Sequence, residues 1–133
     1  MSFELHPNFS SKIFLLDLPL CRVLLENECH YPWIFLIPRR NNIQRMMELL
    51  PQDQLQLLSE LDLAQKVLWN AFQPTQLNIA AIGNKTPQLH LHVIARFQHD
   101  PAWPATVWDH PTRAPYSSQR LKEVEEILKS AFL

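Results

Sequence analysis

A single glycine, Gly83, is the feature that most restricts what this chain of 133 residues can fold into. Walker-type phosphate loops and dinucleotide-binding turns need two or three glycines within a few residues, because their backbone approaches phosphate closely or adopts a left-handed conformation. The sequence contains no such cluster. Folds built on those loops are therefore excluded, and any nucleotide chemistry has to rely on other side chains.

Charge and length narrow the class of protein further. Twelve Lys and Arg residues are balanced by thirteen Asp and Glu residues, so no basic field is available to hold an extended nucleic acid. The first residues lack the basic and apolar regions of a signal peptide, and no uncharged stretch is long enough to span a bilayer. We therefore expect a cytoplasmic protein with no membrane segment. The length predicts that residues 1–133 form one domain.

The distribution of apolar residues predicts an α+β fold. Five segments are short, apolar and bounded by proline, glycine or polar residues, as strands are: 13–18, 20–25, 33–37, 76–82 and 88–97. Two segments have apolar residues at helical spacing: 51–72 and 121–131. The same spacing already begins at 42–50, whereas the proline-rich stretch 100–115 predicts an ordered loop. This order indicates an antiparallel sheet with a long middle helix and a C-terminal helix on one side.

The segment 88–97 carries the side chains that could take part in catalysis. Side chains alternate between the two faces of a strand, so Gln88, His90 and His92 share one face, opposite a set of apolar neighbours. Two imidazoles on a rigid strand can act on the same small substrate. The face with the histidines is therefore expected to line a groove.

Three interpretations of this histidine pair are open from the residues alone. The pair could lie on a solvated face without a function. It could bind zinc or iron, although the motif contains no acidic residue, and His99, Asp100, Asp109 and His110 follow it at no recognised spacing. The third interpretation is covalent catalysis at phosphorus, because a neutral imidazole is a good nucleophile near pH 7.

The third interpretation is the one that a resemblance favours. The pattern Gln88-x-His90-x-His92 followed by two apolar residues, with Gly83-Asn84 before it, resembles the signature of the histidine-triad (HIT) superfamily of nucleotide hydrolases and transferases. The similarity extends over residues 10–110. The segment 100–104 with Val107-Trp108 is similar to the bacterial diadenosine-tetraphosphate-hydrolase-like branch.

The resemblance implies roles for particular residues and an assembly. His90 matches the nucleophile that attacks the α-phosphorus of a nucleoside phosphoramidate, dinucleoside polyphosphate or nucleotide conjugate. His92 matches the residue that donates hydrogen bonds to phosphate oxygens or to the leaving group. The positions expected to contact the nucleotide are Asn27, Asn84, Lys85 and Trp108. The family also implies a homodimer without a metal or other cofactor.

Two departures from the family pattern leave a second function open. Gln88, the third of the expected catalytic residues, replaces the first histidine of the triad, and its amide can donate a hydrogen bond but cannot shuttle a proton. Trp33 stands where many relatives carry another histidine. The alternative is therefore a nucleotide-binding module that keeps the fold with little or no catalysis.

Overall fold

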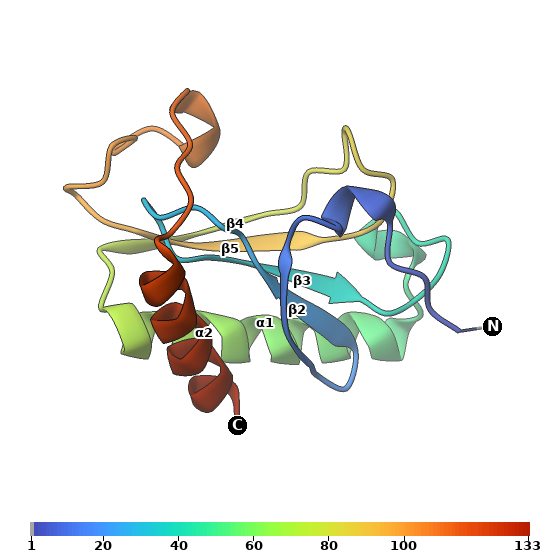
Figure 1. The fold of residues 1–133 in the computed structure, drawn as a ribbon. Helices are drawn as coiled ribbons and strands as arrows, with labels where there is room; N and C mark the ends of the chain where they lie inside the picture. The colour runs from blue at the N-terminus through green and yellow to red at the C-terminus, as the bar shows by residue number, and fades with distance from the viewer. Residues whose placement is uncertain (1) are drawn as a thin grey trace.

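The computed structural model describes residues 2–133, and within them five strands form one antiparallel sheet accompanied by two α-helices (Figure 1). The strands are β1 (Ile13–Asp17), β2 (Cys21–Leu25), β3 (Trp33–Pro38), β4 (Gln76–Ala80) and β5 (Leu91–Arg96), in the spatial order β1-β2-β3-β5-β4. The helices are α1 (Pro51–Phe72) and α2 (Ser118–Phe132). This is the predicted α+β fold with a long middle helix and a C-terminal helix.

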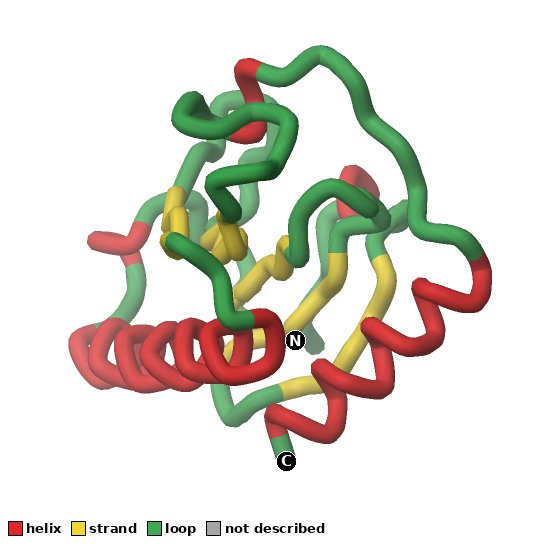
Figure 2. The backbone as a smooth tube through the Cα atoms, turned by 90° about the vertical axis from the view of Figure 1, so that its left-hand side faces the viewer, coloured by secondary structure: helices red, strands yellow, loops and turns green. Residues whose placement is uncertain are grey.

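Both helices pack on one face of the sheet, as predicted, and the long loops cover the other face (Figure 2). On the helix side, strand residues such as Val23, Leu36 and Val93 join Leu68 of α1 and Leu128 of α2 in the larger core cluster. Burying these apolar faces is the main favourable term in folding a sheet against helices. No helix within residues 2–133 combines the length and apolar character that a membrane crossing requires.

The opposite face of the sheet has a smaller aromatic core. Phe35 and Ile94 lie here, together with Phe9 from the 3₁₀ turn Pro7–Phe9 and Val107 from the turn Val107–Asp109. The N-terminal segment and the loop after β5 are therefore packed onto the sheet. Between them a cavity reaches the buried side chains of the histidine-bearing strand.

Two predicted elements differ from the structure at their ends. The helical spacing at 42–50 gives only the 3₁₀ turn Met46–Glu48, and Met46 and Met47 are exposed. A residue before proline disfavours the α conformation, and Leu50, which precedes Pro51, is extended (φ −60°, ψ 150°), so the long helix begins at the proline.

The strand predicted at 88–97 is shorter in the structure. Nearest its N-terminal end, Leu91 pairs with Leu36 of β3 and His92 pairs with Ala80 of β4. Residues 88–90 therefore lie past the end of β4, and they have no ladder partner on β3 although that strand continues to Pro38. In this stretch the Leu89 N–H donates a hydrogen bond to the Ile43 carbonyl at 2.8 Å.

Candidate active site

The two histidines lie on the face of β5 that faces away from the helices. Leu89, Leu91 and Val93 belong to the core beneath α1 and α2, whereas His90 and His92 contact the aromatic side of the sheet. This is the alternation expected from the sequence. It also holds for His90, which lies one residue before the beginning of β5. The imidazole centroids are 5.1 Å apart, with the ring planes at 74°.

One nitrogen of each imidazole is hydrogen-bonded to a group that can act only as a donor or only as an acceptor. His90 Nδ1 lies 2.7 Å from the carbonyl oxygen of Gln88, which can only accept, so this nitrogen carries the proton. His92 Nδ1 lies 3.0 Å from Nε1 of Trp33, which can only donate, so this nitrogen is unprotonated. In their neutral forms, the Nε2 of His90 therefore has a free lone pair and the Nε2 of His92 carries a hydrogen. The partners assign opposite tautomers to two neighbouring rings.

The surroundings keep both rings neutral near pH 7. Burial lowers the pKa of His92 to about 3, and the proximity of His90 and of the Lys12 ammonium lowers it as well. Burial also lowers the pKa of His90, and Lys12 acts in the same direction, against the hydrogen bond to the Gln88 carbonyl. Neutral imidazole is the form that can act as a nucleophile, and a neutral Nε2–H can still donate a hydrogen bond.

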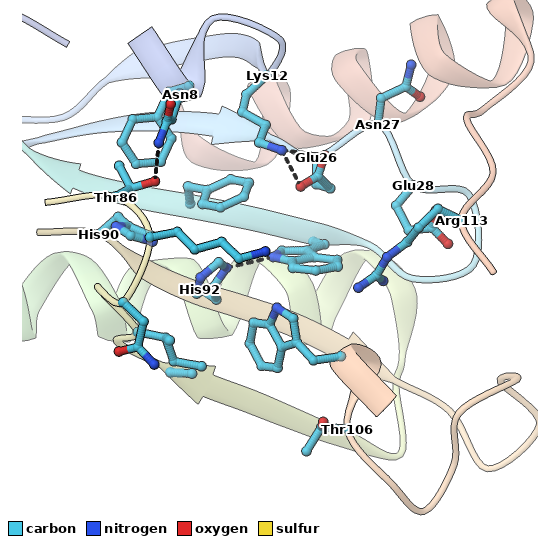
Figure 3. Close-up of a pocket in the computed structure, with 18 residues that line it drawn as sticks. Asn8, Lys12, Glu26, Asn27, Glu28, Thr86, His90, His92, Thr106 and Arg113 are labelled. Carbon is cyan, nitrogen blue, oxygen red and sulfur yellow. Dashed lines mark hydrogen bonds and ion pairs between the residues drawn. The ribbon is translucent and has the colours of Figure 1, made fainter. Parts of the chain in front are cut away.

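The histidines open into a cavity of about 940 Å³. Aromatic side chains flank the histidines in its wall: the Trp108 ring stands edge-on to His92 at 5.0 Å, and Phe9 stands edge-on to His90 at the same distance. Figure 3 shows the cavity extending from Asn8 and Thr86 at one end, past both histidines, to Glu28 and Arg113 at the other. The volume and apolar walls are those of a small-molecule site.

Charged side chains lie around the cavity. Lys12 Nζ is 2.7 Å from Oε2 of Glu26, and the Arg113 guanidinium lies over the Trp33 ring at 5.2 Å from its centroid. Glu28 is buried, and its carboxylate accepts a hydrogen bond from the Ala114 N–H at 2.8 Å. The cations can attract a phosphate, whereas Glu28 helps to fix the loop that carries Arg113.

All four residues predicted to contact nucleotide line this cavity. Trp108 covers His92, and Asn84 and Lys85 are exposed at the edge. Asn27 also lines the cavity, but its Oδ1 accepts a hydrogen bond from the Tyr116 N–H at 2.9 Å. Its amide therefore holds the segment that leads into α2, in addition to any contact with a ligand.

Gln88 does not line the large cavity. It borders a second cavity of about 460 Å³, which adjoins the first at His90 and Asn84. Its side-chain amide is hydrogen-bonded to the N-terminal segment: Oε1 accepts from the His6 N–H, and Nε2 donates to the Glu4 carbonyl, both at 2.9 Å.

Several lining residues were missed from the sequence. Phe9, Lys12 and Arg113 come from segments that carry no motif, and only the fold brings them to the histidines. Phe35 could have been found, because it alternates with Trp33 on the strand that pairs with β5. Within residues 2–133, no group of three or more His, Cys, Asp and Glu side chains is close enough together to hold a metal ion.

Comparisons with known proteins place the chain in a family. The model of the HIT domain matches residues 9–99. A histidine triad protein from Bradyrhizobium japonicum is 33% identical, with a TM-score of 0.97 over 100% of both chains. Another from Marinobacter aquaeolei is 36% identical, with a TM-score of 0.94 over 99% of this chain and 97% of that one.

More distant structures share the fold alone. The diadenosine triphosphate hydrolase of Plasmodium falciparum is 16% identical, with a TM-score of 0.60 over 96% of this chain and 88% of its own. A sequence search of curated proteins finds no match. The matched domain covers most of the chain and includes both histidines, and the protein therefore belongs to the histidine-triad (HIT) family.

Proposed function

We propose that the protein is a nucleotide hydrolase or transferase that cleaves at the α-phosphorus of a nucleotide through a covalent intermediate on His90. The observation that carries this proposal is the pair of opposite tautomers: a free lone pair on His90 Nε2 beside a hydrogen on His92 Nε2. One ring is prepared to attack, and its neighbour is prepared to donate a hydrogen bond. Family membership and the aromatic cavity support the same function.

The first step forms a bond between His90 Nε2 and the α-phosphorus and breaks the bond from phosphorus to the leaving group. The ring becomes positively charged, and its Nδ1–H is already held by the Gln88 carbonyl. The Nε2–H of His92 donates to a phosphate oxygen as negative charge develops there, a type of contact worth about 10²–10³ in rate. In the second step water attacks the phosphorus and loses a proton to solvent, His90 leaves as a neutral imidazole, and a mononucleotide is released.

The absence of a protonatable group at position 88 favours particular substrates. A polyphosphate departs from phosphorus as a stable anion, whereas the amine of a phosphoramidate has to gain a proton as it leaves. We therefore place dinucleoside polyphosphates ahead of nucleoside phosphoramidates and other nucleotide conjugates. The aromatic walls would hold the base, with Asn84, Lys85 and Trp108 near the phosphates and Asn27 near the ribose.

The experiment is a turnover screen with a trap for the intermediate. Diadenosine polyphosphates and adenosine phosphoramidate are incubated with the wild type, His90→Ala and the control His99→Ala, whose exposed side chain lies outside the cavity. We expect release of AMP and an alkali-stable, acid-labile nucleotidyl adduct on His90 in the wild type and in the control, and neither with His90→Ala. Unchanged turnover by His90→Ala would refute the mechanism.

The alternative is a nucleotide-binding module with little catalysis. The observation that favours it is the engagement of both polar atoms of the Gln88 amide by the N-terminal segment, so the first position of the triad cannot assist the leaving group. A module of this kind would bind nucleotide in calorimetry without forming any trapped adduct. A burst of covalent intermediate would exclude it.

We also propose a cytoplasmic homodimer. Strand β4 is at the edge of the sheet, where its backbone can pair with a second copy. Two apolar side chains from neighbouring parts of the sequence, Ile79 on β4 and Trp69 near the end of α1, are exposed. Light scattering should give twice the mass of the chain, and Ile79→Lys should shift the equilibrium towards the monomer. A monomer at all concentrations would refute the assembly.

A further inference from the structure

The Gln88 side chain connects the histidine strand to the beginning of the chain. Its amide oxygen accepts from the His6 N–H and its amide nitrogen donates to the Glu4 carbonyl, across 82 and 84 residues of sequence. These two backbone groups belong to residues two apart, so the amide pairs with the segment as a neighbouring strand would. Gln88 is buried, and both hydrogen bonds are therefore costly to lose.

The segment that Gln88 holds, residues 2–9, is here called the N-terminal strap. Two further side chains fix it: Asn41 pairs with the Glu4 N–H and the Ser2 carbonyl, and Asn8 Nδ2 donates to Thr86 Oγ1, each at 2.9 Å. The Asn41 contacts are exposed, as is the Asn8 contact. The two bonds of Gln88 lie between them and are the better shielded from water.

The strap ends against the proposed nucleophile. Phe9, its last residue, is buried and stands edge-on to the His90 ring at 5.0 Å and to Phe35 at 6.0 Å. The carbonyl of Gln88 meanwhile accepts the hydrogen of His90 Nδ1. One residue therefore holds His90 from two sides, through its own backbone and through the strap.

The choice of glutamine has a chemical reason. A planar amide presents a donor and an acceptor on the same edge, as a peptide group does, and can bond to two groups on one stretch of backbone. The two nitrogens of an imidazole point away from each other across the ring, so a histidine could bond to only one of these groups. Compared with histidine, glutamine at position 88 gives up a titratable side chain and gains two hydrogen bonds to the N-terminal strap.

We propose that Gln88 is a positioning residue that clamps the N-terminal strap and, through Phe9, keeps the nucleophilic His90 packed, dry and correctly oriented. The clamp itself is independent of the proposed function, and its catalytic consequence rests on that function. In this role Gln88 does not contact the substrate. Its loss acts through the mobility of the strap and the hydration of His90.

The first test measures the clamp in the protein without nucleotide. Gln88→Met keeps the length of the side chain and removes both hydrogen bonds, and Gln98→Met is the matched control on an exposed glutamine just after β5. We expect hydrogen–deuterium exchange of residues 2–9 to become about 10-fold faster or more in Gln88→Met and to stay unchanged in the control. Unchanged exchange in Gln88→Met would overturn the clamp.

The second test isolates one of the two bonds. His6 has a φ of −61°, which proline also adopts, so His6→Pro removes the N–H donor with the backbone angle retained. His6→Ala is the matched control, because it keeps this N–H and loses only the imidazole that accepts from the Asn8 N–H. We expect His6→Pro to mobilise the strap more than His6→Ala. Equal exchange in the two variants would overturn the assignment of the bond.

The third test follows His90 by NMR titration, again without substrate. The Lys12 ammonium lowers the pKa of this ring, and the His92 ring lies beside it with the centroids 5.1 Å apart; the variants change neither group. Admission of water to His90 should raise its pKa towards 6.5 in Gln88→Met and in His6→Pro. A pKa equal to that of the wild type in both variants would overturn the link from the strap to His90.

The catalytic consequence is tested with Gln88→His, which restores the first histidine of the triad. If Gln88 acts as a clamp, this variant mobilises the strap and lowers kcat for diadenosine polyphosphates. A kcat that rises while exchange of the strap stays at the wild-type rate would overturn the positioning role. Absence of turnover in the wild type would instead refute the proposed function, and the first three tests would still decide the clamp.

Discussion

Removal of the indole donor that fixes His92 is the sharpest perturbation of the proposed mechanism. Trp33 Nε1 donates to His92 Nδ1 at 3.0 Å between two buried side chains, and this bond keeps the hydrogen of His92 on Nε2. Trp33→Phe retains an aromatic ring on β3 and deletes the donor. His92 can then place its hydrogen on Nδ1, and in that tautomer it can no longer donate to phosphate.

The size of the effect is bounded from both sides. The loss of a partner for a buried acceptor costs about 1–3 kcal/mol, which corresponds to about 5–150-fold in an equilibrium. The effect also cannot exceed the loss of the His92 contact, about 10²–10³ in rate. We therefore expect kcat to fall about 5–150-fold in Trp33→Phe and more in His92→Ala.

The assay is single-turnover formation of the nucleotidyl adduct in Trp33→Phe, His92→Ala and the double variant. Because Trp33 acts on the chemical step through His92, the double variant should be no slower than His92→Ala. Trp108→Phe is the comparison for lost aromatic contact: its ring also touches His92, at 5.0 Å, but within residues 2–133 its N–H has no hydrogen bond to that ring. This variant should change KM more than kcat.

Two results would refute this reasoning. The first is an adduct that forms in Trp33→Phe at the wild-type rate. The second is a double variant in which the losses in rate multiply, because Trp33 would then act on the reaction by a route other than His92. Either outcome would remove the tautomer argument on which the proposed function rests.

Two further predictions concern stability. His92 has a folded pKa of about 3 against 6.5 when unfolded, so the unfolded chain binds the additional proton as the pH falls below 6.5. Urea unfolding should show about 2 kcal/mol less stability at pH 5 than at pH 7.5 from this group, and His92→Gln should lose that part of the slope; equal slopes would contradict it. Asp100 and Arg96 form a buried pair at 2.8 Å at the base of the loop that carries Trp108, and Asp100→Ala leaves Arg96 without its counter-charge. The free energy of unfolding should fall by about 3–5 kcal/mol, and a loss below 1 kcal/mol would show that the pair does not hold the loop.

Local periodicity was enough to predict much of the fold. The helix from Pro51 to Phe72 coincides with its prediction, because proline marks its first turn and the apolar spacing continues to its end. The strands were located, but the one predicted at 88–97 was too long, since a pattern in one segment does not show where its pairing with the neighbouring strands ends. The segment 42–50 does not form the helix that its spacing indicates, because Met46, Met47 and Leu50 are exposed and no common apolar face packs on the core.

The single glycine illustrates the same limit. Gly83 lies beside the second cavity, as expected of a residue before the histidine strand. Its φ is not positive, however, and an added Cβ would come no closer than 3.7 Å to the Thr86 carbonyl oxygen. The sequence therefore excluded the glycine-loop folds correctly, but steric need does not explain the glycine that is present.

The sequence by itself determined which residues share a face. The period of two in a strand places His90 and His92 together, and this follows from backbone geometry alone. The tertiary structure decided what each imidazole can do. The donor to His92 comes from Trp33, 59 residues away, and the strap that packs on His90 is held by Gln88 across more than 80 residues. The side chain's direction is a local property, whereas its tautomer, pKa and hydration depend on the distant groups that the fold places around it.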